Sequence, residues 1–224
     1  MTQKEFNYIF DHTLLKPPAT EAELKVICDE AIRYGFHTVA VNTGVVKACA
    51  AMLEGSNVKV DAAVGFPLGI TTIACKVAET EETIANGAGE VDYVVNIGKV
   101  KEGNYAYIKE EMEQIVAACR RGGVVSKVIF ENCYLTDEEK IELCKIASEV
   151  KPDFIKTSTG FGPSSATVED VKLMRKYVSA DVKVKAAGGV RDLPTCLAML
   201  EAGAERVGCS CSVAIAEAYK NMNK

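Results

Sequence analysis

The chain has 224 residues, of which 48% are hydrophobic and 25% are charged, a composition that is typical of a globular protein and excludes a disordered or fibrous one. Its formal net charge of −5 argues against a nucleic-acid partner, so small molecules or other proteins are the expected partners. The first residues lack the basic and apolar segments of a signal peptide, and no apolar stretch approaches the ~18 residues that cross a bilayer. We therefore expect a cytoplasmic protein with no membrane partner.

Strand-like segments rich in Val, Ile and small residues alternate with amphipathic helical segments along the whole chain. In chain order, the eight strand candidates cover residues 9–14, 38–42, 59–66, 90–97, 126–132, 154–159, 183–187 and 206–210. Three of the helical segments begin with a threonine that is followed three residues later by an acidic residue, a pair that can satisfy free backbone N–H groups. These pairs are Thr20 with Glu23, Thr136 with Glu139, and Thr167 with Asp170.

The repeated strand–helix unit determines the predicted fold. Units spaced by roughly 28 residues, with no Pro- or Ser-rich linker between them, predict a (β/α)8 barrel rather than a doubly wound sheet, with residues 1–224 forming one compact domain. In such barrels the chemistry lies at the carboxyl ends of the strands. The last residues of each predicted strand are therefore the candidates for a functional site.

Nine cysteines are spread through the sequence. The number is odd, and six of them lie in apolar helical patterns, which favours core thiols in a reducing compartment over a disulfide scaffold. These six are Cys28, Cys49, Cys75, Cys119, Cys144 and Cys196. Cys209 and Cys211 are closely spaced, but His12 and His37 lie far from them in the sequence, so we expect no zinc site.

Two lysines and one aspartate are predicted to point into the barrel. In the segment Phe-Ile-Lys-Thr-Ser, the two-residue alternation of a strand places Lys156 opposite its apolar neighbours, and the same reading points Asp92 and Lys185 inward. Each has a structural reading when taken alone, because a buried lysine can pack its stem and pair its ammonium with a carboxylate. Two adjacent inward lysines, however, repel each other.

This repulsion between the two lysines indicates that one of them is a nucleophile. At a separation of ~5 Å and an effective dielectric constant of ~20 the repulsion is roughly 3 kcal/mol, which would lower a lysine pKa from ~10.4 to about 8. Desolvation would lower it further. A neutral amine can attack a carbonyl carbon and form a Schiff base, through which a carbon–carbon bond breaks or forms. Such a route needs an additional acid and base, which Asp92 and Lys185 can supply.

Glycines follow the last three predicted strands, where many barrels bind a phosphate group. The candidate phosphate-binding residues are Gly160, Gly188, Gly189, Gly208 and Ser210. Any one glycine cluster can be a plain turn, but three on consecutive strand ends favour a site. The segment Gly160-x-Gly162-x-x-Ser165 is not predicted to be a dinucleotide fingerprint. Pro163 interrupts the segment, and its last position is not the required glycine.

Five segments together resemble the deoxyribose-phosphate aldolase family: residues 11–17, 64–69, 90–92, 154–160 and 185–191. The resemblance implies a (β/α)8 fold and the reversible condensation of acetaldehyde with glyceraldehyde 3-phosphate to 2-deoxyribose 5-phosphate, with no metal or organic cofactor. By position, Lys156 is similar to the Schiff-base lysine, and Lys185 to a second lysine that lowers its pKa and relays protons. Asp92 is similar to the acid/base, and Asp11 to an aspartate near the relay.

The chain departs from this family at three places. Many relatives carry two adjacent serines where this chain has Ser210 and Cys211, and a thiol is a weaker donor to phosphate. Ala40 and Thr43 stand where relatives often have cysteine and proline, and residues 163–165 replace a glycine-rich segment.

Two alternative functions remain open from the residues alone. One is another sugar-phosphate barrel enzyme, such as a metal-assisted epimerase or a different lysine aldolase. The other is a non-catalytic barrel that binds a phosphosugar. Apolar helix surfaces also leave room for a homodimer.

Overall fold

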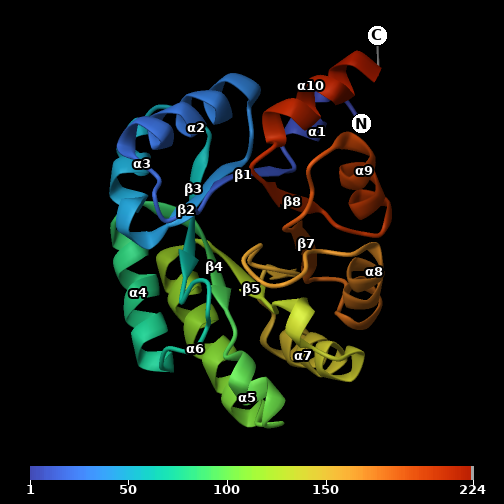
Figure 1. The fold of residues 1–224 in the computed structure, drawn as a ribbon. Helices are drawn as coiled ribbons and strands as arrows, with labels where there is room; N and C mark the ends of the chain where they lie inside the picture. Colours follow the sequence, from blue (N-terminus) through green and yellow to red (C-terminus); the bar gives the residue numbers. More distant parts are fainter. Residues whose placement is uncertain (223–224) are drawn as a thin grey trace.

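Eight parallel strands form a closed barrel in the computed structural model, which describes residues 1–222 (Figure 1). Each strand pairs with the next one in the chain, and β8 pairs with β1. The strands are β1 (Phe10–Leu14), β2 (Thr38–Asn42), β3 (Lys59–Val64), β4 (Ala88–Val94), β5 (Val125–Ile129), β6 (Phe154–Lys156), β7 (Lys183–Ala187) and β8 (Arg206–Cys209). The predicted (β/α)8 fold is confirmed.

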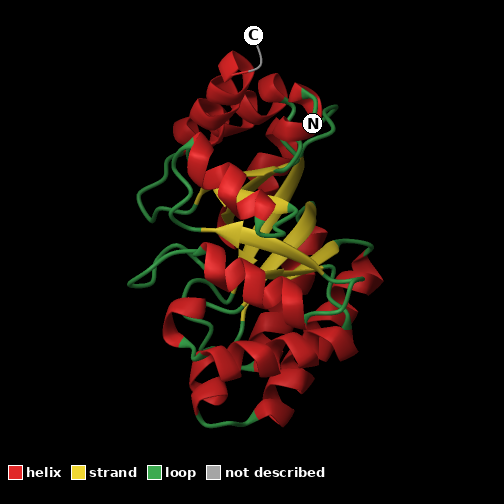
Figure 2. Cartoon of the chain, turned by 90° about the vertical axis from the view of Figure 1, so that its right-hand side faces the viewer, coloured by secondary structure: helices red, strands yellow, loops and turns green. Residues whose placement is uncertain are grey.

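Helices surround the strands on the outside of the barrel (Figure 2). They are α1 (Gln3–Asn7), α2 (Glu21–Tyr34), α3 (Val46–Met52), α4 (Ile73–Ala85), α5 (Ile97–Lys101), α6 (Tyr105–Gly122), α7 (Asp137–Val150), α8 (Val168–Tyr177), α9 (Leu193–Glu201) and α10 (Ser212–Met222), with short 3-10 turns at Thr43–Val45 and Asn132–Tyr134. The predicted threonine caps are present: the side chains of Thr20, Thr136 and Thr167 accept hydrogen bonds from the backbone N–H groups three residues later. No helix among residues 1–222 is long and apolar enough to span a membrane.

Several strands are shorter than predicted. The sixth ends at Lys156 rather than at residue 159, yet Thr157, Ser158 and Thr159 remain buried. The Thr157 N–H still donates to the Lys185 carbonyl at 3.1 Å before the chain leaves the sheet. The predicted strand was too long because the alternation of residue types indicates which residues are buried. Burial continues past the last residue that pairs regularly in the strand.

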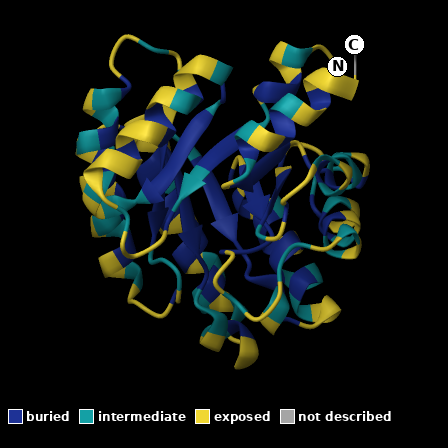
Figure 3. Cartoon of the chain, turned by 45° about the horizontal axis from the view of Figure 1, so that its top comes forward, coloured by how far each residue is buried: buried dark blue, intermediate teal, exposed yellow. Residues whose placement is uncertain are grey.

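The hydrophobic core lies between the strands and the helices, where Figure 3 shows the barrel as a buried layer. Val91, Tyr93 and Val95, which alternate with the inward-pointing Asp92, belong to this core. The predicted core thiols are buried with one exception: Cys75 is exposed, because it lies in the first turn of α4 on the face turned away from the barrel. The inside of the barrel is different, since charged side chains fill much of it.

Candidate active site

The strands carry four acidic and four basic side chains into the barrel, and all eight are buried. The acidic ones are Asp11 on β1, Asp61 on β3, and Glu90 and Asp92 on β4; the basic ones are Lys127 on β5, Lys156 on β6, Lys185 on β7 and Arg206 on β8. We call these eight side chains the interior charge cluster. Because charges are stable in a buried place only when they are paired, the contacts within the cluster determine its chemistry.

Asp92 lies at the centre of the predicted catalytic group. Its Oδ2 accepts hydrogen bonds from Lys156 Nζ and Lys185 Nζ, each at 2.6 Å, and its Oδ1 accepts one from Lys127 Nζ at 2.7 Å. Burial alone would raise the pKa of Asp92, but the three ammonium groups hold it well below its usual value. Asp92 is therefore a carboxylate that is shared by three lysines.

The pKa of Lys156 is lowered, as the sequence predicted, but for a different main reason. Burial is the largest cause, because a buried ammonium loses its hydration, and repulsion from Lys185 adds a smaller effect. Asp92, between the two lysines, acts in the opposite direction. The sequence analysis gave the main effect to Lys185 and only a further one to desolvation, and it did not include the opposing effect of Asp92.

The pKa of Lys185 is shifted in the opposite direction to that of Lys156. Burial would lower its pKa, but Asp11, Asp61 and Asp92 together raise it above its ordinary value. Its Nζ lies 2.5 Å from Asp11 Oδ2, 2.9 Å from Asp61 Oδ2 and 2.6 Å from Asp92 Oδ2. Lys185 is thus a stable ammonium that can donate a proton, beside a lysine that readily loses one.

Half of the interior charge cluster was not predicted: Asp61, Glu90, Lys127 and Arg206. Lys127 Nζ lies 2.9 Å from Asp61 Oδ1, 2.7 Å from Glu90 Oε2 and 2.7 Å from Asp92 Oδ1. Both Glu90 and Lys127 could have been found, since Glu90 lies two residues before Asp92 on the same strand and Lys127 interrupts an apolar strand.

Arg206 closes the amino-terminal end of the cluster, where it donates hydrogen bonds to Asp11 and, at 3.0 Å, to Glu90 Oε2. Asp11, Asp61 and Glu90 lie close enough together to hold a metal ion. The ammonium and guanidinium groups of Lys127, Lys185 and Arg206 already contact these carboxylates. The carboxylates are therefore paired within the protein itself.

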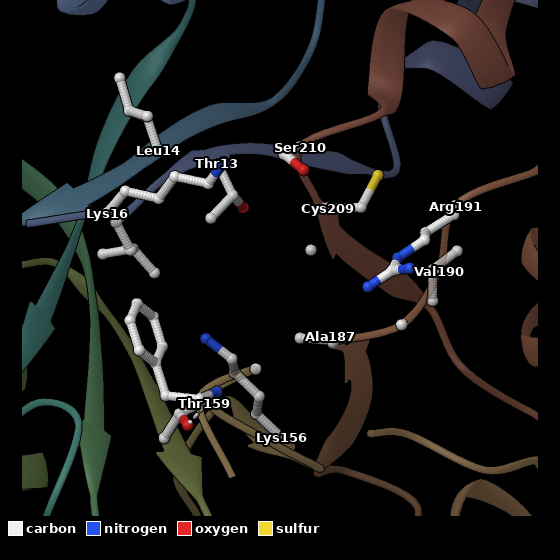
Figure 4. Close-up of a pocket in the computed structure, with 16 residues that line it drawn as sticks. Thr13, Leu14, Lys16, Lys156, Thr159, Ala187, Val190, Arg191, Cys209 and Ser210 are labelled. Atoms are coloured by element: carbon white, nitrogen blue, oxygen red, sulfur yellow. Dashed lines mark hydrogen bonds between the residues drawn. The ribbon is translucent and has the colours of Figure 1, made fainter. Parts of the chain in front are cut away.

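A cavity of about 390 Å³ lies at the carboxyl ends of the strands, next to Lys156 (Figure 4). All five predicted phosphate-binding residues line it: Gly160, Gly188, Gly189, Gly208 and Ser210. Lys16 and Arg191, which the sequence analysis did not assign, also line it. Figure 4 shows the Lys156 amine and the Arg191 guanidinium pointing into the same cavity. The cavity therefore places positively charged side chains and glycine backbone near the Lys156 amine.

Two glycines keep side chains out of places that the site needs. Gly189 has a φ of +75°, and a Cβ there would lie 2.6 Å from Ser165 Cβ. A Cβ at Gly208 would lie 3.2 Å from Lys185 Cε. The first glycine allows the turn after β7, and the second leaves room for the Lys185 stem.

The amino end of α10 faces the same region, since Ser210 and Cys211 come directly before it. Free N–H groups at a helix start favour an anion. Among the described residues that line the cavity, Ser210 is present and Cys211 is not, so the thiol at position 211 replaces no lining side chain.

A buried glutamate holds the segment that follows Lys156. Glu131 has a left-handed backbone, with a φ of 55°, and its carboxylate accepts hydrogen bonds from the Thr159 hydroxyl and, at 3.1 Å, from the Thr159 N–H. Thr159 and the neighbouring Gly160 both line the cavity. Sequence reasoning missed this role, because the contact joins the segment after β5 to the one after β6.

Comparison with known proteins identifies similar molecules. Residues 7–217 match the family model described as DeoC/LacD family aldolase. The chain is 53% identical over 219 residues to the deoxyribose-phosphate aldolase of Lactobacillus acidophilus, a match that covers 98% of this chain and 92% of the other. Among solved structures, it is similar to an aldolase called QR15, with 37% identity, a TM-score of 0.92 and 97% of both chains covered. It is also similar to a tetrameric deoxyribose phosphate aldolase from Aeropyrum pernix, with 27% identity, a TM-score of 0.91, and 99% of this chain and 93% of the other covered.

Proposed function

Since the chain belongs to the DeoC/LacD family of aldolases, we propose that it cleaves and forms 2-deoxyribose 5-phosphate through a Schiff base at Lys156. The products of cleavage are acetaldehyde and glyceraldehyde 3-phosphate. The observation that carries the proposal is the buried Lys156 amine, with its lowered pKa, at the wall of a cavity that also has cationic and glycine-rich walls. The proposed route uses no metal or organic cofactor.

The first stage is formation of the Schiff base. The neutral Lys156 amine attacks the aldehyde carbon C1 of the open-chain sugar, the nitrogen loses one proton and the carbonyl oxygen takes up one, which gives a carbinolamine. Loss of this hydroxyl with a second proton releases water and leaves a protonated imine. Lys185 suits the role of proton donor, because its pKa is raised and its Nζ shares Asp92 Oδ2 with Lys156.

The second stage breaks the bond between C2 and C3. A base removes the proton from the C3 hydroxyl, the C3 carbonyl forms, and the electron pair of the bond moves through C2 to the imine nitrogen. Glyceraldehyde 3-phosphate leaves, and the remaining enamine takes a proton at C2. Water then hydrolyses the acetaldehyde imine and frees Lys156.

We assign this proton transfer to Asp92 and Lys185, because Asp92 contacts both Lys156 and Lys185. In this assignment, Asp11 keeps Lys185 protonated.

The phosphate group of the sugar is assigned to the opposite side of the cavity. Backbone N–H groups at Gly188, Gly189 and Gly208 and the Ser210 hydroxyl are the proposed donors, with Gly160 on the rim. Arg191 and Lys16 add positive charge to this wall. A dianionic group is favoured here by the positive charge of Arg191 and Lys16.

The test traps the intermediate. The protein is mixed with acetaldehyde, reduced with borohydride and digested, and the peptides are mapped by mass spectrometry. We expect an ethyl group on Lys156, no such adduct in the Lys156→Ala variant, and an unchanged result in Lys183→Ala, which removes an exposed lysine from the neighbouring strand. An adduct on a different lysine, or none on the folded protein, contradicts the assignment.

A second measurement separates the alternatives. Cleavage of 2-deoxyribose 5-phosphate is followed with and without a chelator. Full activity in the chelator that is lost in Lys156→Ala excludes the metal-assisted epimerase and the non-catalytic barrel. Activity that the chelator removes contradicts the Schiff-base route.

The cellular setting and the assembly of the chain are further parts of the proposal. We place the protein in the cytoplasm, because its nine cysteines are free thiols in the described structure, as expected in a reducing compartment. Its proposed partners are the phosphorylated sugar and the two aldehydes. The homodimer stays a prediction, which light scattering tests by giving the mass in solution.

A further inference from the structure

The interior charge cluster balances only when Lys156 is protonated. It contains four carboxylates and four basic groups, so its net charge is zero with an ammonium at Lys156 and −1 with the neutral amine. An unbalanced charge in a buried place is costly, so a proton bound elsewhere in the cluster would favour the reactive amine. His37 Nε2 lies 3.0 Å from Glu90 Oε1, and His37 is 17% exposed and outside the interior charge cluster.

Short hydrogen bonds connect Lys156, through Asp92 and Lys185, to the carboxyl group of Asp61. Lys156 Nζ and Lys185 Nζ both lie 2.6 Å from Asp92 Oδ2, and Lys185 Nζ lies 2.9 Å from Asp61 Oδ2. These contacts form an unbroken path from the Lys156 amine to the Asp61 carboxylate. Asp61 itself is 1% exposed and lies outside the residues that line the cavity.

We propose that Asp61 is a positioning residue that acts through Lys185 and holds the proton that Lys156 releases when it becomes nucleophilic. The inference rests on the proposed function, since it concerns how Lys156 becomes a neutral amine. It adds a residue that contacts neither the cavity nor the substrate.

The proton transfer balances as follows. Lys156 gives a proton to Asp92, Asp92 gives one to Lys185, and Lys185 gives one to Asp61. Asp92 and Lys185 end in the states in which they began, while Lys156 has lost a proton and Asp61 has gained one. The net charge of the cluster stays at zero throughout.

The surroundings of Asp61 favour the protonated form. Burial is the main cause that raises its pKa, to about 6, and repulsion from Asp92 and Asp11 adds to it, while Lys127 and Lys185 oppose it. Glu90 lies nearby, and Arg206 and Lys156 are further charged groups that interact with Asp61.

The first test reads the proton directly and needs no activity. Infrared difference spectra report the carbonyl band of a protonated carboxylic acid. In Lys156→Met the cluster has lost one cation, so we expect this band at neutral pH, and we expect it to disappear in Lys156→Met/Asp61→Asn. If the band is absent in Lys156→Met, or persists in the double variant, Asp61 does not hold the proton.

The second test measures the reactivity of Lys156. The rate of adduct formation with acetaldehyde and cyanoborohydride is followed against pH. Asp61→Asn has the charge of protonated Asp61, so Lys156 should lose its proton more easily. The acid limb, which is the low-pH side of the curve of rate against pH, should therefore move to lower pH by roughly one unit. Glu90→Gln is the matched control, because it removes the same charge from a carboxylate that contacts Lys127 and Arg206, and its shift should be less than half as large.

The two proposals fail in different ways. If wild-type protein forms no adduct at Lys156, the proposed function is wrong. If it forms the adduct but Asp61→Asn leaves the acid limb unchanged, only the inference about Asp61 is wrong. Asp92→Asn should slow adduct formation at every pH, because Asp92 contacts Lys156 directly.

Discussion

A buried ion pair between two helices offers a quantitative test of the electrostatics of this barrel. Lys76 on α4 and Glu111 on α6 are fully buried, with Lys76 Nζ 2.6 Å from Glu111 Oε1 and 2.7 Å from the Val94 carbonyl. The other carboxylate oxygen accepts a hydrogen bond from the Asn96 N–H at 3.0 Å. The pair thus holds the segment at and beyond the end of β4. The perturbations are Lys76→Met, Glu111→Leu and the double variant.

The cost of Lys76→Met at pH 7 can be bounded. The variant leaves a buried carboxylate without its cation, which is strongly destabilising, but the protein can avoid this by protonating Glu111. From an unfolded pKa of about 4.3, protonation at pH 7 costs about 4 kcal/mol, and at pH 5 it costs about 1 kcal/mol. The unpaired Val94 carbonyl adds about 1–3 kcal/mol at either pH.

The pH dependence has opposite signs in the two single variants. Burial raises the pKa of Glu111 in the folded protein and lowers that of Lys76. A raised carboxyl pKa destabilises the fold as pH rises through it, so Lys76→Met should regain stability towards pH 5. A lowered lysine pKa destabilises the fold at low pH, so Glu111→Leu should lose about 5 kcal/mol at pH 7 and only about 2 kcal/mol at pH 9. The double variant has neither charge and should show no such slope.

The assay is urea unfolding of the wild type and the three variants at pH 5, 7 and 9. Equal slopes of unfolding free energy against urea concentration indicate that the unfolded states are comparable. Between pH 5 and pH 7, the unfolding free energy of Lys76→Met should fall relative to wild type by about 3 kcal/mol. If this difference is absent, or if the double variant is less stable than Lys76→Met at pH 7, the reasoning about the buried pair is refuted.

Two further predictions concern the phosphate site and helix capping. Gly189→Ala places a Cβ against Ser165 in a left-handed turn, so the KM for 2-deoxyribose 5-phosphate should rise about tenfold, with a smaller change for unphosphorylated 2-deoxyribose; equal changes for the two sugars would remove Gly189 from the phosphate site. Thr136→Ala removes the cap of α7 and should lower the unfolding free energy by about 1 kcal/mol in urea titrations, with KM unchanged, while Thr136→Ser should retain most of the stability.

The sequence was sufficient for the fold and for the central trio of residues. Strand alternation is a local property, so it predicted the inward direction of Asp92, Lys156 and Lys185 without any knowledge of their neighbours. The glycines at the late strand ends were equally local. Because parallel strands end at the same edge of a barrel, separate segments could be assigned to one site.

The other contacts could not be predicted, because they depend on distances between separate strands and helices. Asp61 and Arg206 each stand alone in their strands, and nothing local says that one pairs with Lys185 and the other with Asp11. Lys76 and Glu111 lie 35 positions apart on separate amphipathic helices, where charged residues are usually solvated. Burial was ranked below the repulsion from Lys185 as a cause of the lowered pKa of Lys156, because the extent of burial depends on the closed barrel.

The order of charges along the chain has a consequence for how the molecule assembles. Asp11, Asp61, Glu90 and Asp92 all come from β1 to β4, and Lys127, Lys156, Lys185 and Arg206 all come from β5 to β8. A first half-barrel formed alone would enclose only negative groups, and a second would enclose only positive ones. Neither half can form a dry interior by itself, so the interior becomes electrically satisfied only when the two halves close along β4 with β5 and β8 with β1. The charges that surround Lys156 thus also couple the halves of the barrel into one cooperative unit.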